Sequence, residues 1–156
     1  MVFNFTQKVL FKHCDPAGIV FFPRYFEMMN DCVEAFFEEA LQWPFESFHL
    51  TGGVPTATIA TKFTAPSRHG DKLVLTLEIG RIGRSSFSYL MTAHCMEEQR
   101  FSTEAILVHT NKIGKPTPIP DAVREHLTKF IKVVARPIKI FTQMDGRQLL
   151  AMQMEY

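Results

Sequence analysis

Long apolar runs are missing from this sequence of 156 residues. None of its apolar stretches approaches the roughly 20 residues that a membrane-spanning helix needs, so we expect no membrane partner. The first five residues also lack the charged segment and the apolar core of a signal peptide. The formal net charge is only +1, and this near balance of charges does not favour a nucleic-acid partner.

Cysteine is scarce, and its spacing excludes several kinds of site. Cys14, Cys32 and Cys95 are far apart and form no C-x-x-C pair, which is typical of reduced thiols and predicts a cytoplasmic location. We interpret all three as packing residues, because the carboxylate next to Cys14 disfavours the reactive thiolate form. The sequence shows no metal-spaced His/Cys cluster, no glycine-rich phosphate loop and no G-x-S-x-G motif, so we predict no metal ion and no cofactor.

Phenylalanine and methionine, by contrast, are abundant, with 15 and 8 residues. So many bulky apolar side chains predict a large core, an apolar ligand pocket or a buried subunit interface, and the composition alone does not separate these three. The length suits one domain with its own core. We therefore interpret residues 1–156 as a single domain, in which residues from about 132 to 156 form a C-terminal extension.

The segment from Asp15 to Tyr25, D-P-A-G-I-V-F-F-P-R-Y, is the most informative part of the chain. Asp15 precedes a turn made by Pro and Gly, and Pro23 suits the first position of a helix, where its missing N–H has no intrahelical partner to lose. A carboxylate is therefore expected near a helix N-terminus with unpaired N–H groups, which combines a base or nucleophile with an oxyanion site. An Asp before Pro-x-Gly is also a common turn residue that accepts a nearby N–H, so both roles stay open.

Periodic patterns predict the rest of the fold. Apolar residues recur at helical spacing from Tyr25 to about Gln42, which predicts an amphipathic helix of roughly 30 Å. Alternating patterns predict strands at 3–11, 54–64, 73–79, 85–95 and 101–110, joined by connections short enough for antiparallel hairpins. A second helix is expected over 121–131, and the runs 138–143 and 147–152 suggest a hairpin or a docking arm. This order predicts an α+β fold, with an antiparallel five-stranded sheet wrapped around the long helix.

The segment Asp15–Tyr25 resembles the hotdog-fold acyl-CoA thioesterases of the 4-hydroxybenzoyl-CoA thioesterase type. Three further stretches agree with the same pattern: P-x-x-x-G-D at Pro66–Asp71, R-S-S-F at Arg84–Phe87, and P-I-P at Pro118–Pro120. The resemblance covers residues from about 3 to 130. It implies a hotdog fold, a homodimer or homotetramer with active sites between subunits, and an acyl-CoA substrate that is hydrolysed without a metal or redox cofactor.

The resemblance also implies roles for individual residues. Asp15 would be the catalytic carboxylate, which attacks the thioester carbonyl or activates water, while the backbone N–H of Phe22 would polarise the carbonyl oxygen. Asn30 and Tyr25 would contact the acyl group. The coenzyme A part of the substrate would be bound at the start of a strand, by Arg84, Ser85 and Ser86.

Two positions depart from the family pattern. Related short-chain thioesterases carry a His where this chain has Pro23, so a His-assisted mechanism is not expected there. His13 lies nearby in the sequence, but a His at the end of a strand more often has a structural role. The 4-hydroxybenzoyl enzymes carry an Asp where the ungapped match places Asn30, and an amide can hydrogen-bond a phenol but brings no charge. The many Phe and Met residues therefore favour an aryl or medium-chain acyl group.

Other interpretations stay open. By charge alone, further basic residues are candidates for the coenzyme A phosphates: Arg68, Arg81, Lys112 and Lys115. The leading interpretation is an acyl-CoA thioesterase, and the alternative is a non-catalytic protein that binds or assembles acyl thioesters on the same scaffold. A hotdog dehydratase is a weaker third interpretation, because no second acid/base residue is paired with Asp15.

Overall fold

The computed structural model describes residues 1–132, and the runs expected at 138–143 and 147–152 lie outside the described residues. The elements in chain order are β1 (Phe3–Lys8), a 3₁₀ turn η1 (Phe11–His13), α1 (Phe22–Ala35), a π-helical turn η2 (Phe36–Ala40), α2 (Phe45–Phe48), β2 (Gly52–Gly53), β3 (Thr56–Phe63), β4 (Lys72–Ile82), β5 (Ser86–Cys95), β6 (Glu98–Val108), β7 (Thr110–Asn111) and α3 (Asp121–Lys129).

The longer strands form one antiparallel five-stranded sheet in the order β1-β4-β5-β6-β3, and β2 pairs separately with β7. The prediction of a hairpin at residues 66–71 is wrong, because β3 pairs with β6 and not with β4. The chain between β3 and β4 instead crosses from one edge of the sheet to the position next to β1. This crossing segment, residues 64–71, therefore passes over one end of the sheet.

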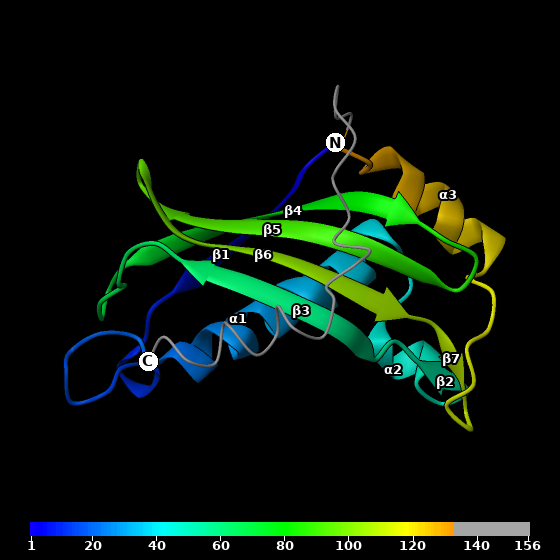
Figure 1. Ribbon diagram of the computed structural model, residues 1–156, viewed down its shortest axis with the longest axis horizontal. Helices are drawn as coiled ribbons and strands as arrows, with labels where there is room; N and C mark the ends of the chain where they lie inside the picture. The colour runs from blue at the N-terminus through cyan, green and yellow to red at the C-terminus, as the bar shows by residue number, and fades with distance from the viewer. Residues whose placement is uncertain (133–156) are drawn as a thin grey trace, which may run out of the picture.

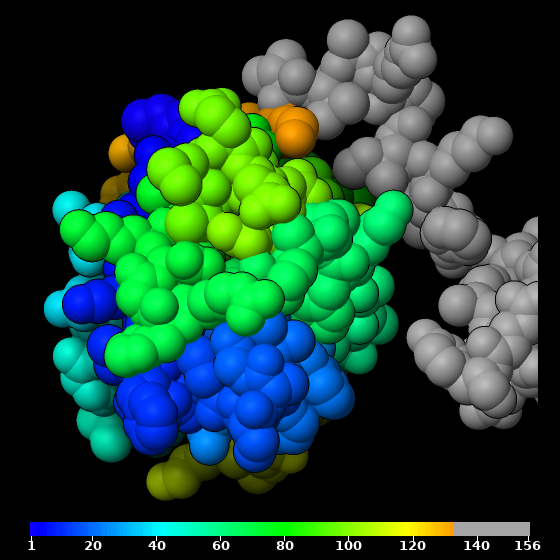
Figure 2. Space-filling model, turned by 90° about the vertical axis from the view of Figure 1, so that its left-hand side faces the viewer, coloured from blue at the N-terminus to red at the C-terminus, as the bar shows by residue number. Residues whose placement is uncertain are grey.

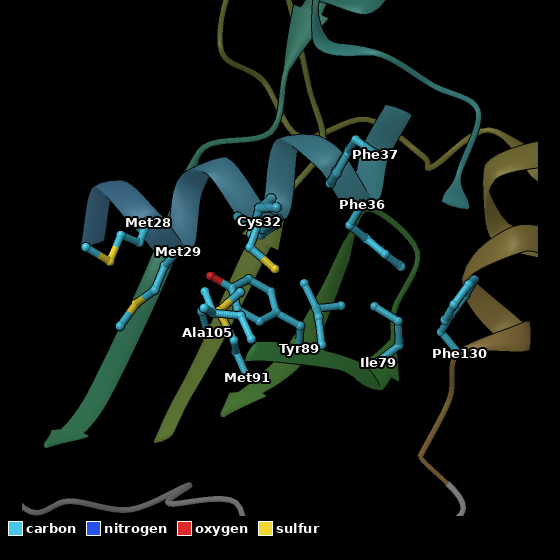
Figure 3. Close-up of a cluster of buried hydrophobic side chains, with 14 of the residues drawn as sticks. Met28, Met29, Cys32, Phe36, Phe37, Ile79, Tyr89, Met91, Ala105 and Phe130 are labelled. Atoms are coloured by element: carbon cyan, nitrogen blue, oxygen red, sulfur yellow. The ribbon is translucent and has the colours of Figure 1, made fainter. Parts of the chain in front are cut away.

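The long helix α1 lies against one face of the curved sheet (Figure 1). Met28 and Cys32 from α1 and Phe36 from η2 are at most 1% exposed, and the side chains of Cys32 and Phe36 point toward strand residues such as Tyr89 and Ile79 (Figure 3). Burial of each large apolar side chain contributes about 1.5–3 kcal/mol to folding, so this layer supplies much of the stability. The predicted α+β fold, a sheet wrapped around a helix, is confirmed.

The helix is less regular than its sequence pattern predicts. α1 ends at Ala35, and the chain continues as the π-helical turn η2, in which the N–H of Leu41 donates to the carbonyl of Phe36 at 3.1 Å. Gln42 then adopts a φ of 52° and ends the helical path. The short helix α2, which begins directly after Pro44, was missed, because its four residues are too few for a periodic signal.

The first strand is shorter than predicted, since β1 ends at Lys8 rather than at residue 11. The N–H of Val9 donates to the carbonyl of Asp71 at 2.8 Å, and the chain then leaves the sheet through η1. Phe11 lies outside the sheet and is 81% exposed, so the strand predicted at 3–11 is too long at this end. The departure from the sheet carries the chain to the start of α1.

Candidate active site

Asp15 lies in a short loop between η1 and α1. The N–H of Asp15 donates to the carbonyl of Ile19 at 3.0 Å, and the N–H of Gly18 donates to the carbonyl of Asp15 at 2.9 Å. Gly18 has a φ of +76°, a left-handed conformation that glycine adopts without steric cost. Below the loop, Cys14 and Val20 pair as an antiparallel bridge. These contacts fix the backbone on both sides of the Asp15 carboxylate.

The Asp15 side chain is half-buried and accepts one hydrogen bond within residues 1–132. Its Oδ1 accepts the N–H of Ala17 at 2.8 Å, which is the turn role that an Asp before Pro-x-Gly commonly has. Its Oδ2 accepts no hydrogen bond from residues 1–132. One carboxylate oxygen therefore holds the turn, and the other is available to a substrate or a water molecule.

Phe22 carries the open backbone donor at the start of α1. Phe21 is the N-cap and Phe22 the first helical residue, so Pro23 is the second residue and not the predicted first. The N–H of Phe21 donates to the carbonyl of His13 at 3.0 Å, and that of Arg24 to the carbonyl of Phe21 at 2.8 Å. Within the described part of the chain nothing accepts the N–H of Phe22, which points from the positive end of a helix of 14 residues.

His13 is buried beside this loop and has a structural role. Its Nδ1 accepts the N–H of Leu10 at 2.9 Å, so the neutral ring carries its proton on Nε2. Burial, followed by the charge of Lys12, lowers the pKa of His13 below its ordinary value of 6.5. These contacts agree with the expectation that His13 is structural.

Tyr25, one turn into α1, lies in the core rather than at an open surface. Its side chain is 4% exposed, its ring packs between Phe63 and Phe101, and its hydroxyl accepts the N–H of Ser67 at 3.1 Å. Figure 2 looks onto this end of the molecule, where the blue segment with Asp15 lies beside the green segment that precedes β4. A contact between Tyr25 and substrate stays a prediction.

An apolar hollow of about 610 Å³ lies between α1, α2 and β3. Asn30 lies at this hollow, whose walls include Phe26, Met29, Val33, Phe45, His49 and Leu107. Phe63 links the hollow to the start of α1, because its ring lies 6.4 Å from that of Phe26 and 6.5 Å from that of Phe22. Phe45 in α2 and His49 directly after it were missed at the sequence level, where only the aromatic residues after Pro44 pointed to them.

Two other ionisable groups in the core stay protonated at neutral pH. Burial raises the pKa of the Cys32 thiol to about 12, and burial together with Cys32 raises the pKa of Tyr89 to about 12. Neither group therefore supplies a negative charge at neutral pH, and Cys32 is unsuited to be a nucleophile. Among residues 1–132, no three His, Cys, Asp or Glu side chains are grouped so that they could hold a metal ion.

Arg84, Ser85 and Ser86 lie at the connection between β4 and β5, far from Asp15 in the same subunit. β4 has 11 residues and spans about 36 Å at ~3.3 Å per residue. Asp71, at its start, contacts the Asp15 end through Val9, whereas Arg84 follows its other end (Figure 1). One subunit alone therefore does not bring the predicted catalytic and coenzyme A-binding residues together.

A family model that describes the thioesterase-like superfamily matches residues 9–127. The chain belongs to this superfamily. Curated protein sequences give no match to this thioesterase. No helix in the described range, residues 1–132, is long and apolar enough to cross a membrane.

Solved structures of thioesterases share the fold. A gentisyl-coenzyme A thioesterase is 26% identical, with a TM-score of 0.72 over 81% of this chain and 99% of that protein. The 1,4-dihydroxy-2-naphthoyl-CoA thioesterase from Synechocystis is 18% identical, with a TM-score of 0.76 over 88% of this chain and 100% of that one. The 4-hydroxybenzoyl-CoA thioesterase from Pseudomonas sp. strain CBS-3 is 20% identical, with a TM-score of 0.75 over 80% and 98%. The hotdog fold is confirmed, and the protein is a thioester hydrolase.

Proposed function

We propose that this thioesterase hydrolyses an acyl-CoA thioester to the free acid and coenzyme A. Asp15 acts as the nucleophile or the general base, and the N–H of Phe22 is the oxyanion donor. One observation carries this proposal: an open carboxylate oxygen and an open helix N-terminal N–H lie on the same short loop. The two ends of this loop are joined by the Cys14–Val20 bridge and by the hydrogen bond from the N–H of Phe21 to the carbonyl of His13.

The chemistry of thioester hydrolysis matches these two groups. Attack on the carbonyl carbon places negative charge on the carbonyl oxygen, and a fixed N–H at a helix N-terminus stabilises that charge. Asp15 either attacks the carbon, forming a mixed anhydride that water then cleaves, or removes a proton from the attacking water. In both cases a C–O bond forms, the C–S bond breaks, and coenzyme A leaves as a thiol after protonation.

The apolar hollow beside α1 favours a substrate with an aryl or medium-chain acyl group. The rings of Phe22, Phe63 and Phe26 lie in contact from the start of the helix to the hollow, and the hollow offers Asn30 as a polar contact. Pockets of this kind combine apolar walls with a few polar groups that orient the ligand. The similar solved thioesterases act on gentisyl, 4-hydroxybenzoyl and 1,4-dihydroxy-2-naphthoyl thioesters, which favours an aryl group here.

The exposed edge of β3 supports a dimer in which the active site lies between subunits. β3 pairs only with β6 within residues 1–132, and nearly all of its residues are exposed. A second copy joined antiparallel to this edge places the Phe63 end of one β3 beside the Thr56 end of the other. Arg84 lies at the Thr56 end, because Pro55 and Ser86 both pair with Val108. Such a dimer brings Asp15 of one subunit toward Arg84, Ser85 and Ser86 of the other.

The test is thiol release from a panel of aryl and fatty acyl-CoA esters by wild type and by Asp15→Asn. The amide keeps the shape and the Ala17 hydrogen bond but removes the charge, so we expect turnover to fall at least ~10²-fold with an unchanged Tm. Asp31→Asn is the matched control, because it removes the same charge from an exposed position on α1. Near-wild-type turnover of a folded Asp15→Asn would contradict the catalytic role. Binding of acyl-CoA without thiol release by the wild type would favour the alternative, a non-catalytic acyl-thioester binding protein.

A further inference from the structure

We propose that Ser67 and Tyr25 are positioning residues that aim the N–H of Phe22 at the substrate carbonyl. The inference rests on the proposed thioesterase function, and it gives a role to the segment 66–71, which the resemblance marks but which touches no substrate in the proposed mechanism. The segment would act through the backbone on both sides of the oxyanion donor.

The backbone of Ser67 makes two hydrogen bonds that bracket Phe22. Its carbonyl accepts the N–H of Val20 at 2.8 Å, two residues before Phe22, and its N–H donates to the Tyr25 hydroxyl at 3.1 Å, three residues after it. Ser67, Val20 and Tyr25 are at most 5% exposed, so water does not compete for these bonds. One residue of another loop therefore ties the end of the Asp15 loop to the first turn of α1.

The segment that carries Ser67 is itself held firmly. Asp71 accepts the N–H of Arg68 at 2.9 Å through Oδ2 and donates its own N–H to the carbonyl of Arg68 at 3.0 Å. The Arg100 guanidinium, from β6, donates to the carbonyl of Pro66 and lies 3.5 Å from the Asp71 carboxylate. Val9 at the end of β1 donates to the carbonyl of Asp71 at 2.8 Å. Ser67 is thus fixed to two strands of the sheet.

The side chains next to the oxyanion donor offer little anchorage of their own. Phe21 is 46% exposed and Phe22 is 58% exposed, so neither ring is held in the core. The direction of the Phe22 N–H is therefore set by backbone hydrogen bonds, those of Phe21 with His13 and Arg24 and those of Ser67 with Val20 and Tyr25. Hydrogen bonds weaken steeply when the donor angle closes, and a displacement of about 1 Å in an active site can lower the rate ~10²-fold.

Tyr25→Phe is the direct test, because it keeps the ring in the core and removes only the acceptor of the Ser67 N–H. We expect kcat to fall about 10-fold with KM unchanged within about twofold, since misplacing an oxyanion donor affects the transition state more than binding. Thr76→Val is the control: Thr76 shares a half-buried hydroxyl hydrogen bond of 2.7 Å with Thr92, remote from the site. Its loss should lower the Tm to a similar extent and leave kcat unchanged.

Amide hydrogen exchange supplies a second readout that does not depend on activity. In Tyr25→Phe the N–H groups of Val20 and Arg24, which are hydrogen-bonded on either side of Phe22, should exchange faster, by about 10-fold, since they lose part of their restraint. In Thr76→Val they should exchange as in the wild type. A wild-type kcat in Tyr25→Phe, an equal loss of kcat in both variants, or unchanged exchange at Val20 and Arg24 would each overturn the inference.

Failure of the proposed function looks different. If Asp15→Asn releases thiol at the wild-type rate, the catalytic assignment falls. The exchange rates alone then test whether Ser67 and Tyr25 position the Phe22 N–H. Faster exchange in Tyr25→Phe would support this positioning role, and unchanged exchange would contradict it.

Discussion

The two ends of the sheet differ in the contacts that stabilise each of them. At the end that carries Asp15, the important contacts are hydrogen bonds of buried or half-buried groups, such as those of His13, Ser67 and Arg100. The Asp15 end also has aromatic contacts around Phe63, which is 42% exposed, whereas the aromatic cluster at the Arg84 end is centred on the fully buried Phe37: Phe37 packs on Phe45 at 5.0 Å and Trp43 stacks on Phe48 at 4.2 Å.

The difference fits the roles that we propose for the two ends. A hydrogen bond fixes direction, which a catalytic carboxylate and an oxyanion donor require, but its net contribution to stability is only about 0.5–1.5 kcal/mol. Aromatic burial is weakly directional and contributes more stability for each residue. We therefore expect substitutions at the Arg84 end to lower stability, and substitutions at the Asp15 end to lower turnover.

The largest expected effect on stability is at the aromatic end. Phe37 is fully buried and contacts five other aromatic rings within residues 1–132, including Trp43 and Phe48. Phe37→Ala should lower the free energy of unfolding by about 3–5 kcal/mol, measured in urea. Activity for each folded molecule should stay within about twofold of the wild type, since the ring does not touch the Asp15 loop. Phe11→Ala, at a side chain that is 81% exposed, is the control and should be nearly neutral. A stable but inactive Phe37→Ala would contradict the expectation that the Arg84 end mainly determines stability.

Mixing two inactive or weakened variants tests whether the two ends meet across the dimer. Asp15→Asn and Arg84→Ala subunits, unfolded together and refolded as a mixture, form heterodimers. If each site combines Asp15 of one subunit with Arg84 of the other, one site in each heterodimer is intact, and kcat/KM rises above that of either variant alone. If both residues serve the site of their own subunit, mixing gives only the average of the two variants.

Arg84→Ala alone should act on binding more than on chemistry. A charged contact to a coenzyme A phosphate is present in both the ground state and the transition state, so KM should rise about 10-fold while kcat changes less than about twofold. Lys129→Ala, which removes an exposed charge from α3, is the control. An unchanged KM in Arg84→Ala would assign the phosphates to another basic residue.

The smallest expected effect is a pH dependence at the Asp15 end. Burial, Lys12 and Arg24 lower the pKa of His13, while Glu27 and Asp31 act in the opposite direction. The folded protein therefore binds this proton less readily than the unfolded chain does, so stability is complete above pH 6.5 and declines as the pH falls below it. Protonation also removes the acceptor for the Leu10 N–H.

Thermal unfolding between pH 7.5 and 5 measures this effect. His13→Gln keeps a hydrogen-bond acceptor but does not titrate, so its Tm should fall less with acid than that of the wild type. An identical pH profile for the two proteins would show that His13 does not contribute to the acid sensitivity.

Much of the fold and part of the site could be predicted from the sequence, because the relevant signals are local. The alternation in residues 73–79 and 85–95 indicates strands that the structure has at Lys72–Ile82 and Ser86–Cys95. The D-P-A-G turn and Pro23 correctly indicate a carboxylate next to a helix start, with an error of one residue at the first helical position. The second helix, predicted at 121–131, is α3 at Asp121–Lys129.

The remaining features depend on contacts between residues far apart in the chain. Periodicity does not reveal that β3 pairs with β6, that Arg84 lies at the opposite end of the sheet from Asp15, or that Tyr25 meets Ser67. A strand pattern specifies which side chains share a face but not which strand lies alongside, and that choice depends on how all the faces are buried together. The sequence thus specifies the Asp15 loop and the elements around it, whereas the hydrogen bond between Tyr25 and Ser67 joins residues that are more than 40 positions apart.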